Sequence, residues 1–395
     1  MLRRRGLLAG IGAFLALPRS GRAGDLGAAC VQAVRGQMAA LGGDGPVLLN
    51  SYLVQAGPAA NDFDLTQANA AYVYDNALAG LLLLAAGYPA EAKRIGDALA
   101  QAQAHDRKFA DGRLRNCYQA GVMAQPAKPA GFWDAKAGRW DEDPYQVGTD
   151  SGPLAWAMLL WAALGMTAPA NRAGNFLDQQ LRAPSGYYGG LYGYDPAQIQ
   201  LTWQSTEQNT DLVVAFRALG RAEDSKHAAG FVRSMLNRST GRFDSGTGPD
   251  GAVNHLAAAD AGIWPYLAGL GSDLSALNAI GVLQRGSGIG FSNASDGIWL
   301  EGTAFAALAL KLMRHLSFAE SFLATVAQNI SPEGYAYATV APVLSTGLTV
   351  GPSLQPGQPE QKFNYYRRPS LSATCWAGLA ALGVNPLAPV QALSK

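Results

Sequence analysis

Six segments of this 395-residue chain share one pattern, and their repetition constrains the fold more than any other feature. Each segment opens with polar, mostly acidic residues and continues as an almost uniformly apolar stretch of helical length, and five of the six stop at glycine. The segments cover residues 74–87, 149–165, 205–220, 258–271, 299–313 and 369–383. A helix that is apolar on every side must be buried on every side, so the pattern predicts six inner helices.

More polar, amphipathic stretches separate these segments. They predict outer helices over residues 89–104, 170–183, 224–238, 273–284 and 318–330, and a further helix over 26–41 that pairs with the last inner helix. The sequence therefore predicts an all-α protein: an (α/α)6 barrel, or toroid, of six inner and six outer helices in one domain over residues 24–395. The inner segments are unevenly spaced, with long loops at 45–70, 105–148 and 331–368, which argues against a regular open solenoid.

Inner helices of such a ring run in the same direction, so their acidic starts are expected to gather at one end. Capping of free backbone N–H groups explains an acid at a helix start, but not why tryptophan or tyrosine accompanies it at five of the six starts. Aromatic rings cover the apolar faces of sugars, and carboxylates and amides bind hydroxyl groups, so we predict a carbohydrate site. Its candidate residues are Tyr72, Asp75, Asn76, Asp150, Trp156, Trp203, Glu207, Asn209, Asp211, Asp260, Trp264, Trp299, Glu301 and Trp376.

Hydrolysis of a glycosidic bond needs two carboxyl groups, one as acid and one as base or nucleophile. The motifs YDNALA, TDSGPLAW, STEQNTD, WLEGT and SATCWAGLAALGVNP make the chain resemble the six-hairpin glycosidases, the (α/α)6 toroid glycoside hydrolases of bacteria, over residues 25–390. The resemblance implies a cleft at the inner-helix N-termini, an inverting mechanism, and chemistry by Asp75, Asp150, Glu207 and Glu301. We expect Glu207 to be the general acid and Asp150 the base, with Glu301 in either role and Asp75 in binding.

The expected activity is hydrolysis of a polysaccharide or oligosaccharide, such as an exopolysaccharide or β-glucan. A polysaccharide lyase or sugar epimerase on the same fold, or a non-catalytic glycan-binding toroid, remain alternatives. The scarcity of histidine at the inner-helix starts argues against the lyase and the epimerase, although His255 lies just before an inner helix. Arg367 and Arg368 leave contact with an acidic sugar open. No nucleotide, phosphate-loop or metal-binding motif is present in the sequence, so we expect neither cofactor nor metal.

The N-terminus has the pattern of a bacterial export signal. Three arginines precede an apolar stretch and a small-residue region ending near Ala23, so residues 1–23 are expected to be a signal peptide, similar to twin-arginine signals. Their removal takes away five arginines and no acid, and changes the formal charge from +1 to about −4. We therefore expect a periplasmic or secreted protein whose partner is a carbohydrate, with no nucleic acid bound and no membrane span after processing.

Overall fold

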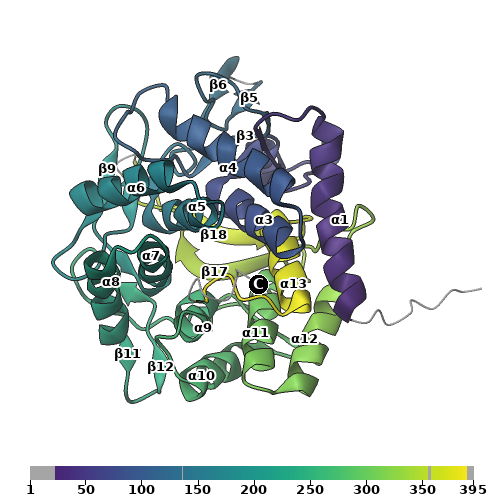
Figure 1. The fold of residues 1–395 in the computed structure, drawn as a ribbon, viewed down its shortest axis with the longest axis vertical. Coiled ribbons are helices and arrows are strands. Elements are labelled where there is room, and N and C mark those ends of the chain that lie inside the picture. Colours follow the sequence, from purple (N-terminus) through teal and green to yellow (C-terminus); the bar gives the residue numbers. More distant parts are fainter. Residues whose placement is uncertain (1–22, 136, 355–356, 389–395) are drawn as a thin grey trace, which may run out of the picture.

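The computed structural model describes residues 23–135, 137–354 and 357–388, and its helices form a closed ring (Figure 1). Each inner helix contacts the next one along the chain, and the last contacts the first, which closes the ring. The inner helices are α3 (Val73–Ala85), α5 (Ser151–Ala163), α7 (Thr206–Ala218), α9 (Ala259–Leu267), α11 (Leu300–Leu312) and α13 (Leu371–Leu382). The predicted signal peptide lies outside the described residues, apart from its last residue.

An outer helix packs against each inner one, so the prediction of an (α/α)6 toroid is confirmed. The outer helices are α4 (Pro89–Ala104), α6 (Thr167–Phe176), α8 (Ala222–Ser234), α10 (Asp273–Leu283), α12 (Leu316–Ala327) and α1 (Ala23–Leu41). Helix α1 lies along α13, so the first and last helices of the chain complete the ring together (Figure 1). Two outer helices end earlier than predicted: α6 continues as a π-helical turn, Leu177–Leu181, and α8 gives way to strand β11 (Leu236–Asn237), paired with β12 (Arg242–Phe243).

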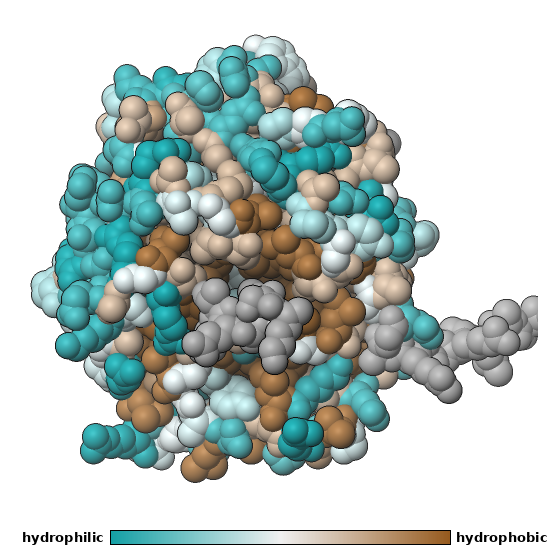
Figure 2. Space-filling view, viewed as in Figure 1, coloured by the Kyte–Doolittle hydropathy of each residue, from teal (hydrophilic) through white to brown (hydrophobic). Residues whose placement is uncertain are grey.

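The two helix layers differ in burial, as their compositions require. Helix α5 buries every side chain from Leu154 to Trp161 because neighbours surround it. Helix α4 buries Ala92, Ile95 and Leu99 on one face only, and its charged residues lie on the other. Figure 2 shows the same arrangement at the surface, where apolar residues gather around the middle of this face and polar residues surround them.

A residue with left-handed backbone conformation follows each inner helix. Five of the six are followed within two residues by a glycine with φ between 70° and 84°, a conformation that only glycine adopts without steric cost. These glycines are Gly87, Gly165, Gly220, Gly269 and Gly383. Helix α11 is the exception predicted by its sequence, since Arg314 takes the left-handed position with φ 65°.

The long connections, expected to be loops, contain short antiparallel sheets. Strands β2 (Ala70–Tyr72), β7 (Thr149–Asp150) and β10 (Gln204–Ser205) run directly into α3, α5 and α7, which fixes the first turn of each helix. β2 pairs with β3 (Cys117–Gln119), β7 with β8 (Gly190–Tyr192), β8 with β9 (Ile199–Leu201), and β10 with β13 (Gly246–Thr247), which also pairs with β14 (Val253–Asn254). The remaining short elements are β1 (Val47–Leu48) with β4 (Gly121–Val122), β5 (Phe132–Asp134) with β6 (Arg139–Asp141), β15 (Gln284–Arg285) with β16 (Gly288–Ile289), and helix α2 (Asp62–Gln67).

A hairpin of β17 (Val343–Thr349) and β18 (Lys362–Tyr366) lies across the middle of the ring (Figure 1). Ser292 holds β17 in place, because its hydroxyl donates a hydrogen bond to the carbonyl of Thr346 at 2.7 Å. Beyond β17, a Cβ on Gly351 would lie 2.5 Å from the ring of Tyr192, so the hairpin reaches the segment between α6 and α7. It therefore spans from the side of α13 to the side of α7.

Two further observations concern the described residues as a whole. None of their helices is both long and apolar enough to cross a membrane. The thiols of Cys30, Cys117 and Cys375 are all buried and form no disulfide.

Candidate active site

The N-terminal ends of the inner helices open into a cleft of about 920 Å³. Its walls also come from α2, from the segment 105–148, from the strands around α7 and from the β17–β18 hairpin. The acidic helix starts therefore meet in one cleft, as the common helix direction requires. Ten of the predicted site residues line it: Tyr72, Asp75, Asp150, Trp156, Trp203, Glu207, Asp260, Trp264, Trp299 and Glu301.

Two predicted amide residues do not line the cleft, and the structure gives them another role. Asn76 Oδ1 accepts the N–H of Leu49 at 2.8 Å, and its Nδ2 donates back to the Leu49 carbonyl at 3.0 Å. Asn209 forms the same pair of bonds with the backbone of Tyr187, at 2.8 and 3.1 Å. Both side chains are fully buried, so they fasten a neighbouring segment to a helix and are not placed to bind sugar.

The two arginines are also turned away from the cleft. Arg367 donates to Asn329 Oδ1 at 2.9 Å and to two backbone carbonyls, and its guanidinium lies over the ring of Tyr337. Arg368 donates to both carboxylate oxygens of Asp64, at 2.6 and 2.7 Å. Neither is among the residues that line the cleft, so in the structure these arginines are not placed for the contact with an acidic sugar that the sequence left open.

His255 lies outside the cleft as well. Its exposed ring is 3.0 Å from a carboxylate oxygen of Asp244. None of the four histidines is among the residues that line the described cleft.

Trp376 and Asp211 lie behind the cleft wall. Trp376 is fully buried, and its ring packs against those of Trp156 and Trp264, which do line the cleft. Asp211 is fully buried one helical turn after Glu207, and neither of its carboxyl oxygens has a hydrogen-bond partner among the described residues. Burial raises the pKa of Asp211 well above its usual value, which favours the protonated form of this side chain behind Glu207.

Glu301 is fixed by donors on both carboxylate oxygens. Tyr74 Oη donates to Oε1 at 2.6 Å, and Ser372 Oγ donates to Oε2 at 2.7 Å. Trp376 Nε1 lies 2.7 Å from Tyr74 Oη, and an indole N–H can only donate. Tyr74 Oη therefore accepts the hydrogen bond from Trp376, and its own O–H donates the hydrogen bond to Glu301. Burial raises the pKa of Glu301 to about 7, and the Tyr74 and Ser372 donors oppose that rise.

Asp150 is placed at the end of β7, where strand β8 comes very close. A Cβ on Gly190 would lie 2.2 Å from the carbonyl oxygen of Thr149 and 2.8 Å from Asp150 Oδ1, so only glycine permits this approach. Asn116 Oδ1 accepts the backbone N–H of Asp150 at 2.7 Å. Oδ1 of Asp150 is buried and has no hydrogen-bond partner among the described residues. Burial raises the pKa of Asp150 to about 7, and the amides of Asn116 and Gln208 lower it.

Glu207 lacks the hydrogen-bond donors that hold Glu301 in place. It is half-buried in the first turn of α7, and no side chain or backbone group of the described residues donates a hydrogen bond to it. Burial raises its pKa well above the usual value, and the negative charges of Asp260, Asp211, Glu301 and Asp150 raise it further. A carboxyl group with no donors and several acidic neighbours gives up its proton less readily than an ordinary glutamate.

Asp75 and Asp260 complete the acidic group. Burial raises the pKa of Asp75 to about 8, with an opposing hydrogen bond from Ser51 and a further rise from Glu301. Burial raises the pKa of Asp260 only to about 6, because the Ala261 N–H donates to its Oδ1 at 2.7 Å. The five carboxyl groups therefore differ in how readily each gives up its proton.

Several residues that line the cleft escaped prediction because they lie outside the helix starts that the pattern singled out. Tyr365 lies on β18, and the centroid of its ring is 5.4 Å from that of Trp299. Burial, together with the negative charges of Glu301, Asp260 and Asp75, raises its pKa, which places the phenol beside the carboxylates. The others are Tyr52, Tyr74, Asn116, Asp143, Tyr145, Phe363 and Ser372. The motifs KFNYYRRP and DEDPY contained several of these, but only the fold brings them to the helix ends.

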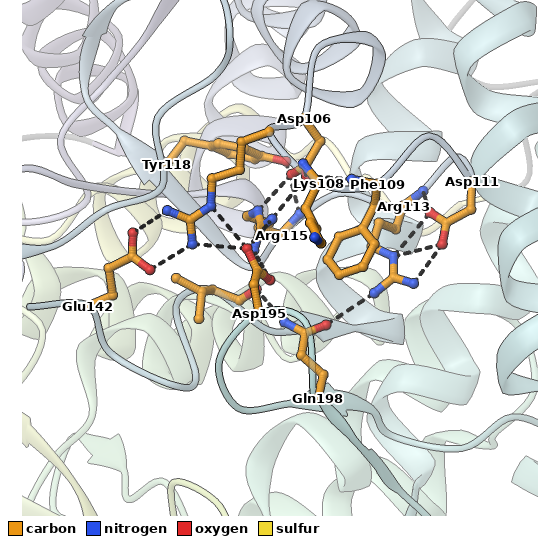
Figure 3. A network of polar contacts seen from close by, with 12 residues as sticks. Asp106, Lys108, Phe109, Asp111, Arg113, Arg115, Tyr118, Glu142, Asp195 and Gln198 are labelled. Carbon is orange, nitrogen blue, oxygen red and sulfur yellow. Dashed lines mark hydrogen bonds and ion pairs between the residues drawn. The ribbon is translucent and has the colours of Figure 1, made fainter.

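An ion-pair network positions the long segment 105–148 (Figure 3). The guanidinium of Arg115 is fully buried and donates to Asp106 at 2.6 and 2.9 Å and to Asp195 at 2.9 and 3.0 Å. Arg107 forms ion pairs with both Asp195 and Glu142. The network fixes the residue before Asn116, and Asn116 in turn holds the backbone of Asp150.

The chain thus has the six-hairpin (α/α)6 toroid fold, with the acidic, aromatic cleft at the N-terminal ends of its inner helices. No family model and no curated protein sequence matches it. Solved structures, in contrast, do match. A structure described as a wild-type glycosidase superposes with TM-score 0.58 at 13% identity, covering 92% of this chain and 98% of that one.

Two other solved structures show the range of activities found on this fold. An α-amylase from Clostridium perfringens has TM-score 0.59 at 9% identity, with 93% and 99% of the two chains covered. A sugar epimerase from a ruminal bacterium has TM-score 0.58 at 12% identity, with 92% and 99% covered. At these identities the likeness establishes the fold, and the activity must be argued from the cleft.

Proposed function

We propose that the protein is a glycoside hydrolase that cleaves a polysaccharide or oligosaccharide, such as an exopolysaccharide or β-glucan, with Glu207 as general acid and Asp150 as base. One contrast carries the proposal. Burial and several acidic neighbours raise the pKa of Glu207 with no opposing donor among the described residues, whereas the amides of Asn116 and Gln208 lower the pKa of Asp150 in the same cleft. The first environment retains a proton to give to the leaving oxygen, and the second can accept a proton from water.

The proposed reaction is an inverting displacement. Glu207 protonates the glycosidic oxygen as the bond from that oxygen to the anomeric carbon breaks. Asp150 takes a proton from the water that attacks the opposite face of the sugar. After the step, Glu207 is ionised and Asp150 is protonated, and exchange with solvent restores both.

Glu301 is assigned to stabilising the positive charge that develops on the sugar ring. Its two oxygens already accept hydrogen bonds from Tyr74 and Ser372, so its orientation is fixed before substrate binds. Trp203, Trp264 and Trp299 supply apolar surfaces for the faces of neighbouring sugar units.

The test is reducing-end release from a panel of neutral, acidic and amino polysaccharides, beside absorbance near 235 nm for unsaturated products. Glu207→Gln and Asp150→Asn should each lower kcat by at least about a hundredfold. Glu223→Gln, on the exposed face of α8, is the matched control and should keep wild-type activity. Full activity in both cleft variants overturns the assignment, and absorbance rising with the reducing ends makes the protein a lyase.

The epimerase found among the similar structures supports one competing activity on this fold. Epimerisation requires a group that removes and returns a proton at a sugar carbon, and the tyrosines beside Glu301 are the candidates in this cleft. Conversion of a free sugar to its epimer, followed by chromatography without any reducing-end release, would establish that alternative.

Export through the predicted signal peptide forms part of the proposal. Expression of the full chain in a bacterium, fractionation and N-terminal sequencing test it directly. A mature protein that begins close to residue 24 in the periplasm or medium supports export, and an unprocessed chain in the cytoplasm contradicts it.

A further inference from the structure

Two exposed tryptophans are paired on the short β5–β6 hairpin, outside the cleft. The chain has eight tryptophans, and the structure describes all of them. Six are buried or half-buried, whereas Trp133 is 57% exposed and Trp140 is 44% exposed. These two are direct partners across β5 and β6, so both side chains lie on the same face of the hairpin. Single exposed apolar residues are ordinary, but two large rings exposed at one place indicate a binding surface.

The hairpin is held at both of its ends. Just before β5, the N–H of Gly131 donates to Asn69 Oδ1 at 3.3 Å. Just after β6, Glu142 accepts a hydrogen bond from Arg107 at 2.7 Å. A Cβ on Gly131 would lie 2.6 Å from Trp140 Nε1, so the ring of Trp140 rests directly on the backbone at this glycine. The surface is therefore formed before a ligand arrives, which lowers the entropic cost of binding.

The hairpin also starts and ends at the wall of the cleft. Ala130, before β5, belongs to a small buried cluster that packs against Tyr72, and Tyr72 lines the cleft. Asp143, after β6, lines the cleft as well. Trp140 precedes Asp143 by three residues, so their Cα atoms lie at most about 11 Å apart. Because β5 and β6 lie at the outer edge of the ring (Figure 1), a long ligand that leaves the cleft over this wall reaches the tryptophans.

Area and charge favour a glycan over a protein or a membrane as the occupant. A fully exposed tryptophan offers up to about 250 Å², so the two rings together expose roughly 250 Å², whereas each partner in a stable protein complex buries about 800 Å². Residues 132–142 carry three acidic and two basic side chains, without the excess of cations that attracts a protein to anionic lipids. Flat rings beside hydrogen-bonding groups match the apolar faces and the hydroxyl groups of sugar units.

We propose that Trp133 and Trp140 form an accessory binding site for a polysaccharide, and that this site holds a part of the chain that extends beyond the cleft. Binding at this site does not require hydrolysis. The further step, that the bound polymer is the substrate, rests on the proposed function. It makes the substrate a long-chain polysaccharide, because a short oligosaccharide cannot occupy the catalytic carboxyl groups and the hairpin together.

The experiment is native affinity electrophoresis of the purified full chain in gels that contain β-glucan, xylan, alginate or dextran. We expect at least one of these polymers to retard the wild-type protein. The double variant Trp133→Ala/Trp140→Ala should bind that polymer about tenfold more weakly, because both aromatic contacts are lost. Trp133→Phe/Trp140→Phe keeps two flat rings on the hairpin and should retain most of the binding. Phe318→Ala removes a ring that is 55% exposed on outer helix α12, and as the matched control it should bind like the wild type.

Two kinds of result overturn this inference. One is that none of the four polymers retards the wild-type protein, or that the wild type and the alanine double variant are retarded equally. The other is that the tryptophans mediate a different contact. Binding to vesicles of phosphatidylglycerol and phosphatidylethanolamine, or dimerisation in size-exclusion chromatography, that is lost in the alanine double variant would show a membrane or protein contact instead.

Glu207→Gln separates this inference from the proposed function. This variant should keep the retardation, because the tryptophans lie outside the catalytic part of the cleft. Tryptophan-dependent retardation without hydrolysis of any glycan supports the accessory site and overturns the proposed hydrolase. Hydrolysis that depends on Glu207, with retardation that does not depend on the tryptophans, supports the hydrolase and overturns only the accessory site.

Discussion

The relay from Trp376 through Tyr74 to Glu301 gives the sharpest prediction for the proposed reaction. Tyr74→Phe removes one of the two donors to the Glu301 carboxylate and also removes the acceptor of the Trp376 N–H. A hydrogen bond to a charged group contributes about 1.5–3 kcal/mol, so the ionised form of Glu301 should become about 10- to 150-fold less favourable. The change raises the pKa of Glu301 further above its present value of about 7.

The sign of the pH effect follows from the role assigned to Glu301. Because the ionised form is the useful one, activity is lost as pH falls through its pKa. We expect kcat of Tyr74→Phe to fall at least tenfold at pH 6 and to recover part of the loss by pH 8, so that the acidic limb of the profile moves to higher pH. Ser372→Ala should move it in the same direction.

A control and a stability measurement separate catalysis from folding. Tyr188→Phe removes a phenol outside the cleft lining and should leave the profile unchanged. Tyr74→Phe should also lower the free energy of unfolding by about 1–3 kcal/mol, because the Trp376 N–H is left unpaired in the interior. A variant that is destabilised but keeps the wild-type pH profile would refute the relay as a device for ionising Glu301.

Three further predictions concern stability. Asp75→Asn should raise the free energy of unfolding at pH 8 by a few kcal/mol but change little at pH 4, as measured by urea denaturation. The folded-state pKa of Asp75, about 8, lies above the ordinary value of 3.8, so wild-type stability falls as pH rises from 3.8 to about 8. Arg115→Met leaves the buried carboxylate of Asp106 without its cation and should cost about 3–5 kcal/mol by the same assay, whereas Arg139→Met, at an exposed pair, should leave the free energy of unfolding nearly unchanged; equal costs would contradict the role of the buried network. Arg314→Gly should raise thermal stability, by about 0.5–1 kcal/mol, because glycine tolerates the left-handed position that follows α11; a decrease would show that the arginine side chain contributes there.

The sequence determined the ring itself. Six stretches apolar on every side demand burial on every side, and six amphipathic stretches demand an outer layer, so the alternation fixes helix inside and helix outside. It also determined that the acidic starts meet, because inner helices joined through outer ones all run in the same direction. The exception at residues 299–313, which lack a terminal glycine, was visible in the sequence and appears as the left-handed Arg314.

The tertiary structure decided which polar residue at a helix start faces the cleft. Asp75 and Asn76 are neighbours in the sequence, but one lines the cleft and the other fastens the backbone of Leu49. Glu207 and Asp211 lie one turn apart on the same helix, yet only the first reaches the cleft. Capping and ligand binding use the same residue types, so composition cannot separate them.

The tertiary structure alone brought in the groups from distant segments. Tyr365 reaches the carboxylates only because the β17–β18 hairpin crosses the ring, and Asn116 reaches Asp150 only because Arg115 is fixed by Asp106 and Asp195. These placements depend on long-range pairing and charge contacts, which have no periodicity along the chain. A repeated helical pattern is local and can be read in sequence, whereas the contacts that tune each carboxyl group exist only after the ring has closed.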